Sequence, residues 1–113
     1  MTDDVLQRLA ETIGERRRES AAKSYTRQLL DAGTERCAKK LGEEATEAVI
    51  AAVSSEPQAL TREAADLVYH LMVVLESRGV PWCDVVAELE RRMGTSGLAE
   101  KAARPERSSG HSP

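Results

Sequence analysis

The stretch EAADLVYHLMVVL, residues 63–75, decides the fold of this chain. Wound as a helix, its part from 67–75 is apolar on nearly every side, so other elements have to cover it all round. Glu63, Asp66 and His70 share a sector of about 60° on that helix, because residues three and four apart lie on one side. The stretch therefore predicts a central helix that begins with an acidic pair.

A second acidic cluster precedes this stretch on a helix of its own. It reads EEATE, residues 43–47. On a helical wheel its three acids share a sector of about 100° with Arg36 and Lys40. The adjoining sector is apolar and holds Cys37, Ala38, Leu41, Ala45, Ala48, Val49 and Ala52. A charged face that only meets solvent would lie opposite the packing face, so this position favours a functional site. One such cluster alone is nevertheless more often a set of surface ion pairs.

Two such helices packed side by side would pool five carboxylates in one small volume. Left unpaired, these charges would repel one another, and a hard divalent cation such as magnesium or manganese would remove that repulsion. A di-iron centre would need Glu-x-x-His pairs, but Tyr69 occupies the third position after Asp66 and His70 the fourth. Arg36 and Lys40, on the acid face, would bind phosphate oxygens. The pattern favours metal-assisted hydrolysis of a phosphate compound.

The composition limits the classes of protein to which the chain can belong. Its 113 residues suit one domain, and 16 lysines and arginines against 19 aspartates and glutamates give a net charge of -3, whereas a dedicated nucleic-acid binder would be basic. With no phenylalanine, the core has to be built from small aliphatic residues, and so short a chain is expected to bury more surface as a homodimer. Cys37 and Cys83 form no CxxC unit and are interpreted as buried or half-buried thiols.

No targeting or membrane segment is expected. The N-terminus MTDD is acidic and no apolar run follows it, and the longest apolar stretch, residues 67–75, is too short to cross a bilayer. We therefore expect a soluble, cytoplasmic protein without a membrane or nucleic-acid partner.

Helical periodicity and capping residues predict an all-α fold, an antiparallel bundle of about four to five helices that is completed by dimerisation. The first helix is expected to begin after Asp3 or Asp4 and to fade at 15–19. The others are expected at 25–31, 34–54, from Pro57 or Thr61 to residue 78, and 82–93, with Ser24 and Thr34 as N-caps of the second and third. From residue 94 the composition turns to glycine, serine, proline and charge, so residues 1–93 form the predicted domain and 94–113 a predicted disordered tail.

Several motifs together resemble a known family. They are Ser24-Tyr25-Thr26, Leu29, Gly33-Thr34, KLGEE at 40–44 followed by Glu47, and EAADLxYHL at 63–71. The ExxE and ExxD pairs alone resemble the all-α nucleoside-triphosphate pyrophosphohydrolase superfamily, also called MazG-like. The other motifs are similar to those of the phosphoribosyl-ATP pyrophosphatases of histidine biosynthesis, and the resemblance covers residues 5–92.

This resemblance implies the hydrolysis of phosphoribosyl-ATP to phosphoribosyl-AMP and pyrophosphate, the second step of histidine biosynthesis. Magnesium, or manganese, would be held by Glu44, Glu47, Glu63 and Asp66 and would activate the attacking water. Glu43 is a further acid that could orient this water. The carboxylate that takes the proton is left open among Glu43, Glu44 and Glu47.

Contacts to the nucleotide substrate are expected beside the acids. Arg36 and Lys40 would bind phosphate, and the Ser24-Tyr25-Thr26 segment could touch phosphate or ribose. Ser24 serves equally well as a helix cap, and His70 either contacts the substrate or supports the site by packing.

Two other functions stay open at this point. A house-cleaning nucleoside triphosphate pyrophosphohydrolase would share the acids and differ in base recognition, whereas a non-enzymatic helical dimerisation module would use the same apolar faces and need no metal. The resemblance also implies a homodimer with its sites near the subunit contact. The chain is expected to be the stand-alone form, because its length leaves no room for the cyclohydrolase that is fused to this domain in many organisms.

Overall fold

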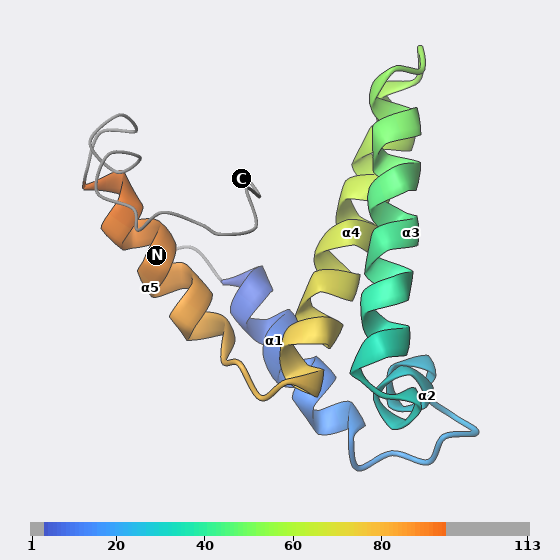
Figure 1. Ribbon diagram of the computed structural model, residues 1–113, viewed down its shortest axis with the longest axis vertical. Coiled ribbons are helices and arrows are strands. Elements are labelled where there is room, and N and C mark those ends of the chain that lie inside the picture. The colour runs from blue at the N-terminus through green and yellow to red at the C-terminus, as the bar shows by residue number, and fades with distance from the viewer. Residues whose placement is uncertain (1–3, 95–113) are drawn as a thin grey trace, which may run out of the picture. The chain divides into compact units, whose positions relative to one another are not determined.

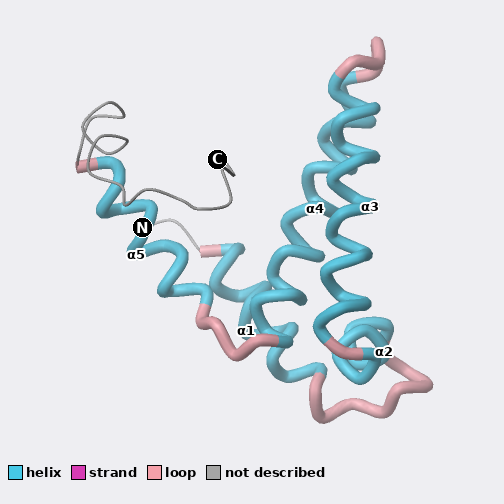
Figure 2. The backbone as a smooth tube through the Cα atoms, viewed as in Figure 1, coloured by secondary structure: helices cyan, strands magenta, loops and turns pink. Residues whose placement is uncertain are grey.

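The computed structural model describes residues 4–94. Within that range the chain forms five helices and no strand (Figures 1 and 2): α1 (Val5–Arg16), α2 (Tyr25–Ala32), α3 (Thr34–Ala52), α4 (Pro57–Ser77) and α5 (Trp82–Met93). The predicted all-α class is confirmed. The predicted tail, apart from Gly94, lies outside the described residues, as does Asp3.

Local capping explains where the first three helices begin. Asp4 accepts a hydrogen bond from the Gln7 amide at 3.0 Å, and Ser24 caps α2 by accepting one from the Arg27 amide at 3.1 Å. The predicted N-cap of α3 was wrong. Gly33, at φ 97°, ends α2 and begins α3, so Thr34 is already helical. The Thr34 hydroxyl instead pairs with Ser77 Oγ at 3.0 Å.

Helices α3 and α4 run antiparallel and lie side by side as a long hairpin (Figure 1). Pro57 opens α4, where its missing amide hydrogen costs nothing. Helices α1 and α2 pack against one end of this hairpin, and the other end projects beyond them. We call the covered end, residues 34–41 and 67–77, the base, and the projecting end, residues 42–66, the tip.

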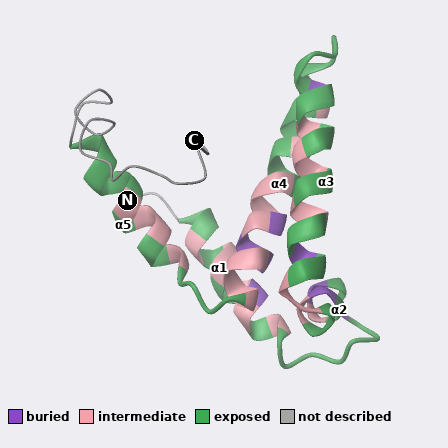
Figure 3. Cartoon of the chain, viewed as in Figure 1, coloured by how far each residue is buried: buried purple, intermediate pink, exposed green. Residues whose placement is uncertain are grey.

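The hydrophobic core lies at the base. Its buried members come from four helices (Figure 3) and are Ile13, Leu29, Cys37, Met72 and Val73. Trp82 and parts of α1 and α4 pack around them. Small and medium-sized side chains therefore do build this core, as the composition predicts, and one chain covers most of the second half of α4.

The tip departs from the predicted packing pattern. Val49, assigned to the packing face of its helix, is 65% exposed, and its neighbours Ile50 and Val53 are also exposed. Helix α4 alone contacts this part of α3 among α1–α4, so the apolar sector of α3 extends further than its partner can cover. The interpretation of the thiols is also half wrong, since Cys37 is buried but Cys83 is exposed.

Of the residues that the structure describes, those from 83 onward form a unit of their own, apart from the unit that ends at residue 82. In its helix, α5, Glu88 binds two arginines one turn later, with Oε2 at 2.6 Å from Arg91 Nη2 and at 3.0 Å from Arg92 Nε. These bonds lower the pKa of Glu88 to about 2.

No helix in the described part of the chain has both the length and the apolar character needed to span a membrane.

Candidate metal centre between α3 and α4

Three carboxylates meet where the tip joins the base. Glu44 of α3 and Glu63 and Asp66 of α4 each offer one oxygen, and these oxygens all lie within 4.8 Å of one another. The spacing of three residues puts Glu63 and Asp66 on one side of α4, and the antiparallel turn brings that side against Glu44. The predicted pooling of acids from both clusters is therefore present in this group.

Glu63 carries the strongest sign of a missing partner. Its Oε1 atom is buried and accepts no hydrogen bond from any residue that the structure describes. Loss of solvent raises the pKa of this carboxyl group first, and the negative charges of Asp66, Glu44 and Glu47 raise it further. A buried oxygen among like charges fits a bound cation. Because the available ligand atoms are all oxygens, a hard divalent ion such as magnesium or manganese suits them best.

The other two predicted acids lie at the edge of this group. Glu47 is not one of the three converging carboxylates, although its charge contributes to the raised pKa of Glu63. Glu43 turns toward the base and forms an ion pair with Lys40, with 3.2 Å between Oε1 and Nζ. Neighbouring glutamates on one helix thus face different surroundings, because each residue turns by about 100°.

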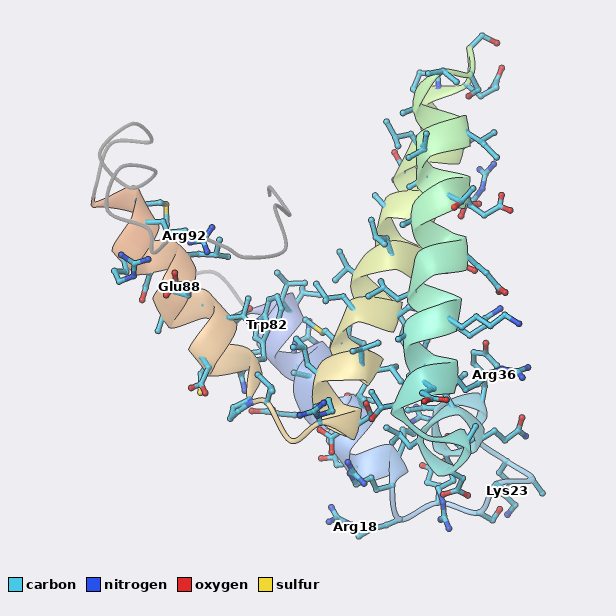
Figure 4. The ribbon with its side chains drawn as sticks, viewed as in Figure 1. Arg18, Lys23, Arg36, Trp82, Glu88 and Arg92 are labelled. Carbon is cyan, nitrogen blue, oxygen red and sulfur yellow. The ribbon has the colours of Figure 1, made fainter. Side chains whose placement is uncertain are left out.

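The two predicted phosphate-binding cations differ in position. Lys40 lies close to the acids, and its pKa is raised by the hydrogen bond to Glu43 first and then by nearby negative groups that include Glu44. Arg36 is exposed and points away from α4 at the beginning of α3 (Figure 4). Lys40 alone is therefore placed beside the three carboxylates.

The Ser24-Tyr25-Thr26 segment at the start of α2 is largely occupied within the protein. Ser24 is buried and caps the helix, and the hydroxyl of buried Thr26 forms a short hydrogen bond with the Tyr69 hydroxyl. Burial raises the pKa of Tyr69. Only Tyr25 is open to solvent, being 51% exposed. The link between Thr26 and Tyr69 was missed at the level of sequence, since no spacing rule connects residues 43 positions apart.

His70 lies between the acids and α2. It is 6% exposed, and its ring meets Tyr69 and Tyr25 edge-on, with centroids 4.9 and 6.2 Å away. Burial lowers the pKa of His70, the negative charge of Glu44 opposes this, and the positive charge of Lys40 adds to it. Its Nδ1 atom is buried without a hydrogen-bond partner in the described range.

Known proteins match most of the length of this chain in sequence. The sequence model of the PRA-PH family, described as phosphoribosyl-ATP pyrophosphohydrolase, matches residues 6–93. A phosphoribosyl-ATP pyrophosphatase of Rhizorhabdus wittichii is 55% identical over 100 residues, which are 88% of this chain and 94% of the relative. One of Agrobacterium fabrum is 57% identical over 97 residues, 86% of this chain and 91% of the relative.

A third relative with the same name, from Cereibacter sphaeroides, is 53% identical over 88% of this chain and 97% of its own length. The resemblance inferred from the motifs is confirmed. The acids of α3 and α4 and the start of α2 all fall within the matched residues, and the chain belongs to the phosphoribosyl-ATP pyrophosphohydrolase family.

Proposed function

We propose that this chain hydrolyses phosphoribosyl-ATP to phosphoribosyl-AMP and pyrophosphate, as the second step of histidine biosynthesis. The observation that carries the proposal is the convergence of Glu44, Glu63 and Asp66 in a chain that matches this family over residues 6–93. Relatives that match most of the chain carry the name of this activity.

The carboxylates at the junction of tip and base are the proposed metal ligands. Glu44, Glu63 and Asp66 would hold the ion, and Glu47 would complete the set from the next turn of α3. Bound there, magnesium or manganese would neutralise these charges, hold triphosphate oxygens and make a water molecule more acidic. The buried Oε1 of Glu63, which has no hydrogen-bond partner in the described part of the chain, supports this assignment, since a coordinate bond would satisfy it.

The remaining side chains divide the other tasks. Lys40 would bind oxygens of the triphosphate and stabilise the charge that builds up as the bond between the α phosphorus and the oxygen that bridges it to the β phosphate breaks. Arg36, exposed on the same helix, is proposed to meet the part of the substrate that extends beyond Lys40. Glu43 is already paired with Lys40, so the carboxylate oxygen of Glu47 that does not bind the ion is the better candidate to accept the proton of the attacking water.

The test of the function compares substrates on the purified chain. With magnesium present, release of pyrophosphate from phosphoribosyl-ATP is expected at a kcat/KM far above that for ordinary and modified nucleoside triphosphates, and chelation of the metal should stop it. Comparable rates across the panel would instead indicate a house-cleaning pyrophosphohydrolase. No release from any nucleotide, together with no magnesium binding, would indicate a dimerisation module.

We also propose that two chains pair through the tip. Val49, Ile50, Val53 and Leu60 are between 39% and 84% exposed, which leaves four large apolar side chains without cover from α1–α4. A second copy of the same surface would cover them. Met72 and Val73, in the apolar stretch at 67–75, take no part in this pairing, because their own chain buries them.

Light scattering coupled to size exclusion tests this pairing. The wild type is expected at twice the monomer mass of 12.3 kDa, and Val53→Glu should shift it toward the monomer and lower turnover. Thr61→Glu is the control. It adds the same negative charge at another exposed position of the tip, so it shows what the added charge does without the loss of an apolar side chain. A fully active monomer at every dilution would exclude the dimer.

A further inference from the structure

A second cluster of polar groups lies next to the acids, toward α2. We call it the α2 corner, and it consists of His70, Lys40 and the first residues of α2, Tyr25 and Thr26. The His70 ring touches that of Tyr25, and the charge of Lys40 acts on both His70 and Tyr25. The α2 corner thus adjoins the metal centre without containing any of its ligands.

The free polar groups of the α2 corner can all act as hydrogen-bond donors. Ser24 Oγ and the carbonyl oxygen of Ser24 accept from the amides of Arg27 and Gln28, and helix geometry leaves the amides of Tyr25 and Thr26 without an acceptor inside the helix. The ammonium group of Lys40 adds a positive charge, as does the N-terminal end of the α2 dipole. The hydroxyl of Thr26 is not free, since it is bonded to Tyr69.

His70 provides the independent sign that something binds here. A ring that is 6% exposed should have both nitrogens satisfied, yet Nδ1 has no partner among the residues that the structure describes. In a protein interior such an atom is costly to leave unpaired. The missing partner has to be an acceptor if Nδ1 carries the hydrogen, in agreement with the other donors around it.

We propose that the α2 corner is an anion subsite that binds a second phosphate group of the substrate, with the Nδ1–H of His70 donating to one of its oxygens. This inference rests on the proposed function, because it assumes a substrate whose triphosphate lies at Glu44, Glu63 and Asp66. Two phosphates could fill the subsite: the terminal pyrophosphate portion, which is the leaving group, or the monophosphate on the ribose that is linked to the purine.

Entry to the subsite requires one side chain to move. The Nδ1 atom is buried, so it is covered when no ligand is bound. Tyr25 lies edge-on against His70 and is half exposed, so its ring can rotate toward solvent with little loss of packing. In the liganded state the phosphate would take the place of the Tyr25 edge, next to the amides at the start of α2.

Calorimetric binding of two probes tests the proposal on the full chain with magnesium present: inorganic pyrophosphate and ribose 5-phosphate. His70→Phe keeps the ring contacts and removes the nitrogens, and we expect affinity for one probe to fall about tenfold, the worth of one hydrogen bond to a charged group. His70→Asn retains an amide near the position of Nδ1 and should recover part of the loss. If affinity falls for pyrophosphate alone, the subsite binds the leaving group. If it falls for ribose 5-phosphate alone, the subsite binds the monophosphate on the ribose.

Ser77→Ala is the matched control. It removes a partly buried hydroxyl that is bonded to Thr34, outside the α2 corner, so it should lower the melting temperature and leave both affinities unchanged. Wild-type affinity of both probes for His70→Phe would overturn the subsite, even with turnover of phosphoribosyl-ATP intact. If the proposed function itself is wrong, the result is a different one: the wild type releases no pyrophosphate from phosphoribosyl-ATP.

Discussion

The base and the tip of the α3–α4 hairpin use the same two helices in opposite ways. At the base, α1 and α2 cover the hairpin, and Cys37, Met72 and Val73 are at most 2% exposed. At the tip, Ile50 and Val53 are more than half exposed, and the three acids converge at its border with the base. Most of the buried apolar surface that stabilises the subunit is therefore at the base.

This division explains how so small a chain tolerates an unfavourable site. Pooling carboxylates costs stability, because burial and like charges both disfavour the ionised form, and these two causes raise the pKa of Glu63 in that order. Such a site can persist only when other contacts hold its helices in place. The core at the base holds α3 and α4 side by side. The tip can then provide chemistry and a contact surface, and it adds little to the stability of the single chain.

The largest effect is expected for Glu63→Gln, which tests whether the acidic group between tip and base is the active centre. Turnover should fall by about 100-fold or more, since even residues that only support metal ligands cost about 10- to 100-fold when they are changed. The melting temperature without metal should stay the same or rise, because one of the mutually repelling charges is gone. Activity assays and thermal melts on the same preparation measure both.

Glu35→Gln is the control for that change, since it alters an exposed glutamate in the first turn of α3, away from the acidic group. It should leave turnover unchanged. A Glu63→Gln protein with wild-type turnover at saturating magnesium would show that the convergence of acids is not the active centre.

A pair of identical substitutions compares base and tip directly. Ile13→Ala removes a core side chain that is 1% exposed and should lower the free energy of unfolding by about 2 to 5 kcal/mol. Ile50→Ala removes one that is 57% exposed and should change it by about 0.5 kcal/mol or less in the monomer. Urea denaturation at a concentration that keeps the chain monomeric measures the difference.

If Ile13→Ala does not fold, Ile13→Val, with an expected cost of about 0.5 to 1.5 kcal/mol, replaces it. Equal losses at the two positions would mean that the tip contributes to the stability of the single chain as much as the base does. At higher concentration Ile50→Ala should additionally weaken the dimer.

The smallest effect is expected for Glu88 of α5. This acid is paired with two arginines, whereas Glu63 of the tip lies among other acids. The pKa of Glu88 is lowered to about 2 by its two arginines, so its contribution to helix stability is fully present above its unfolded value of 4.5 and is lost as the pH falls toward 2. Far-UV circular dichroism should show a small loss of helix in that window. Glu88→Gln should already lack this contribution at neutral pH, and an identical pH profile of the two proteins would contradict the pairing.

Much of the fold could be predicted because it depends on local rules. Ser24 caps its helix, Pro57 opens another, and the acids recur at helical spacing, so the helices begin and end near their expected positions. Thr34 was wrongly predicted as an N-cap because Gly33, with its positive φ, both ends α2 and begins α3. Val49 was misassigned because a helical wheel shows which residues share a face but not how far the neighbouring helix extends along it.

The sequence by itself determined that the chain is all-α, that it carries two acidic pairs on consecutive helices, and that its motifs are those of one family. These properties depend on periodicity, capping and residue identity, which are local. Only the tertiary structure decided which acids converge, that Glu63 and His70 each bury an atom without a partner among residues 4–94, and that the core lies at one end of the hairpin. Distance and burial arise from contacts between residues far apart in the chain, and no local rule fixes them.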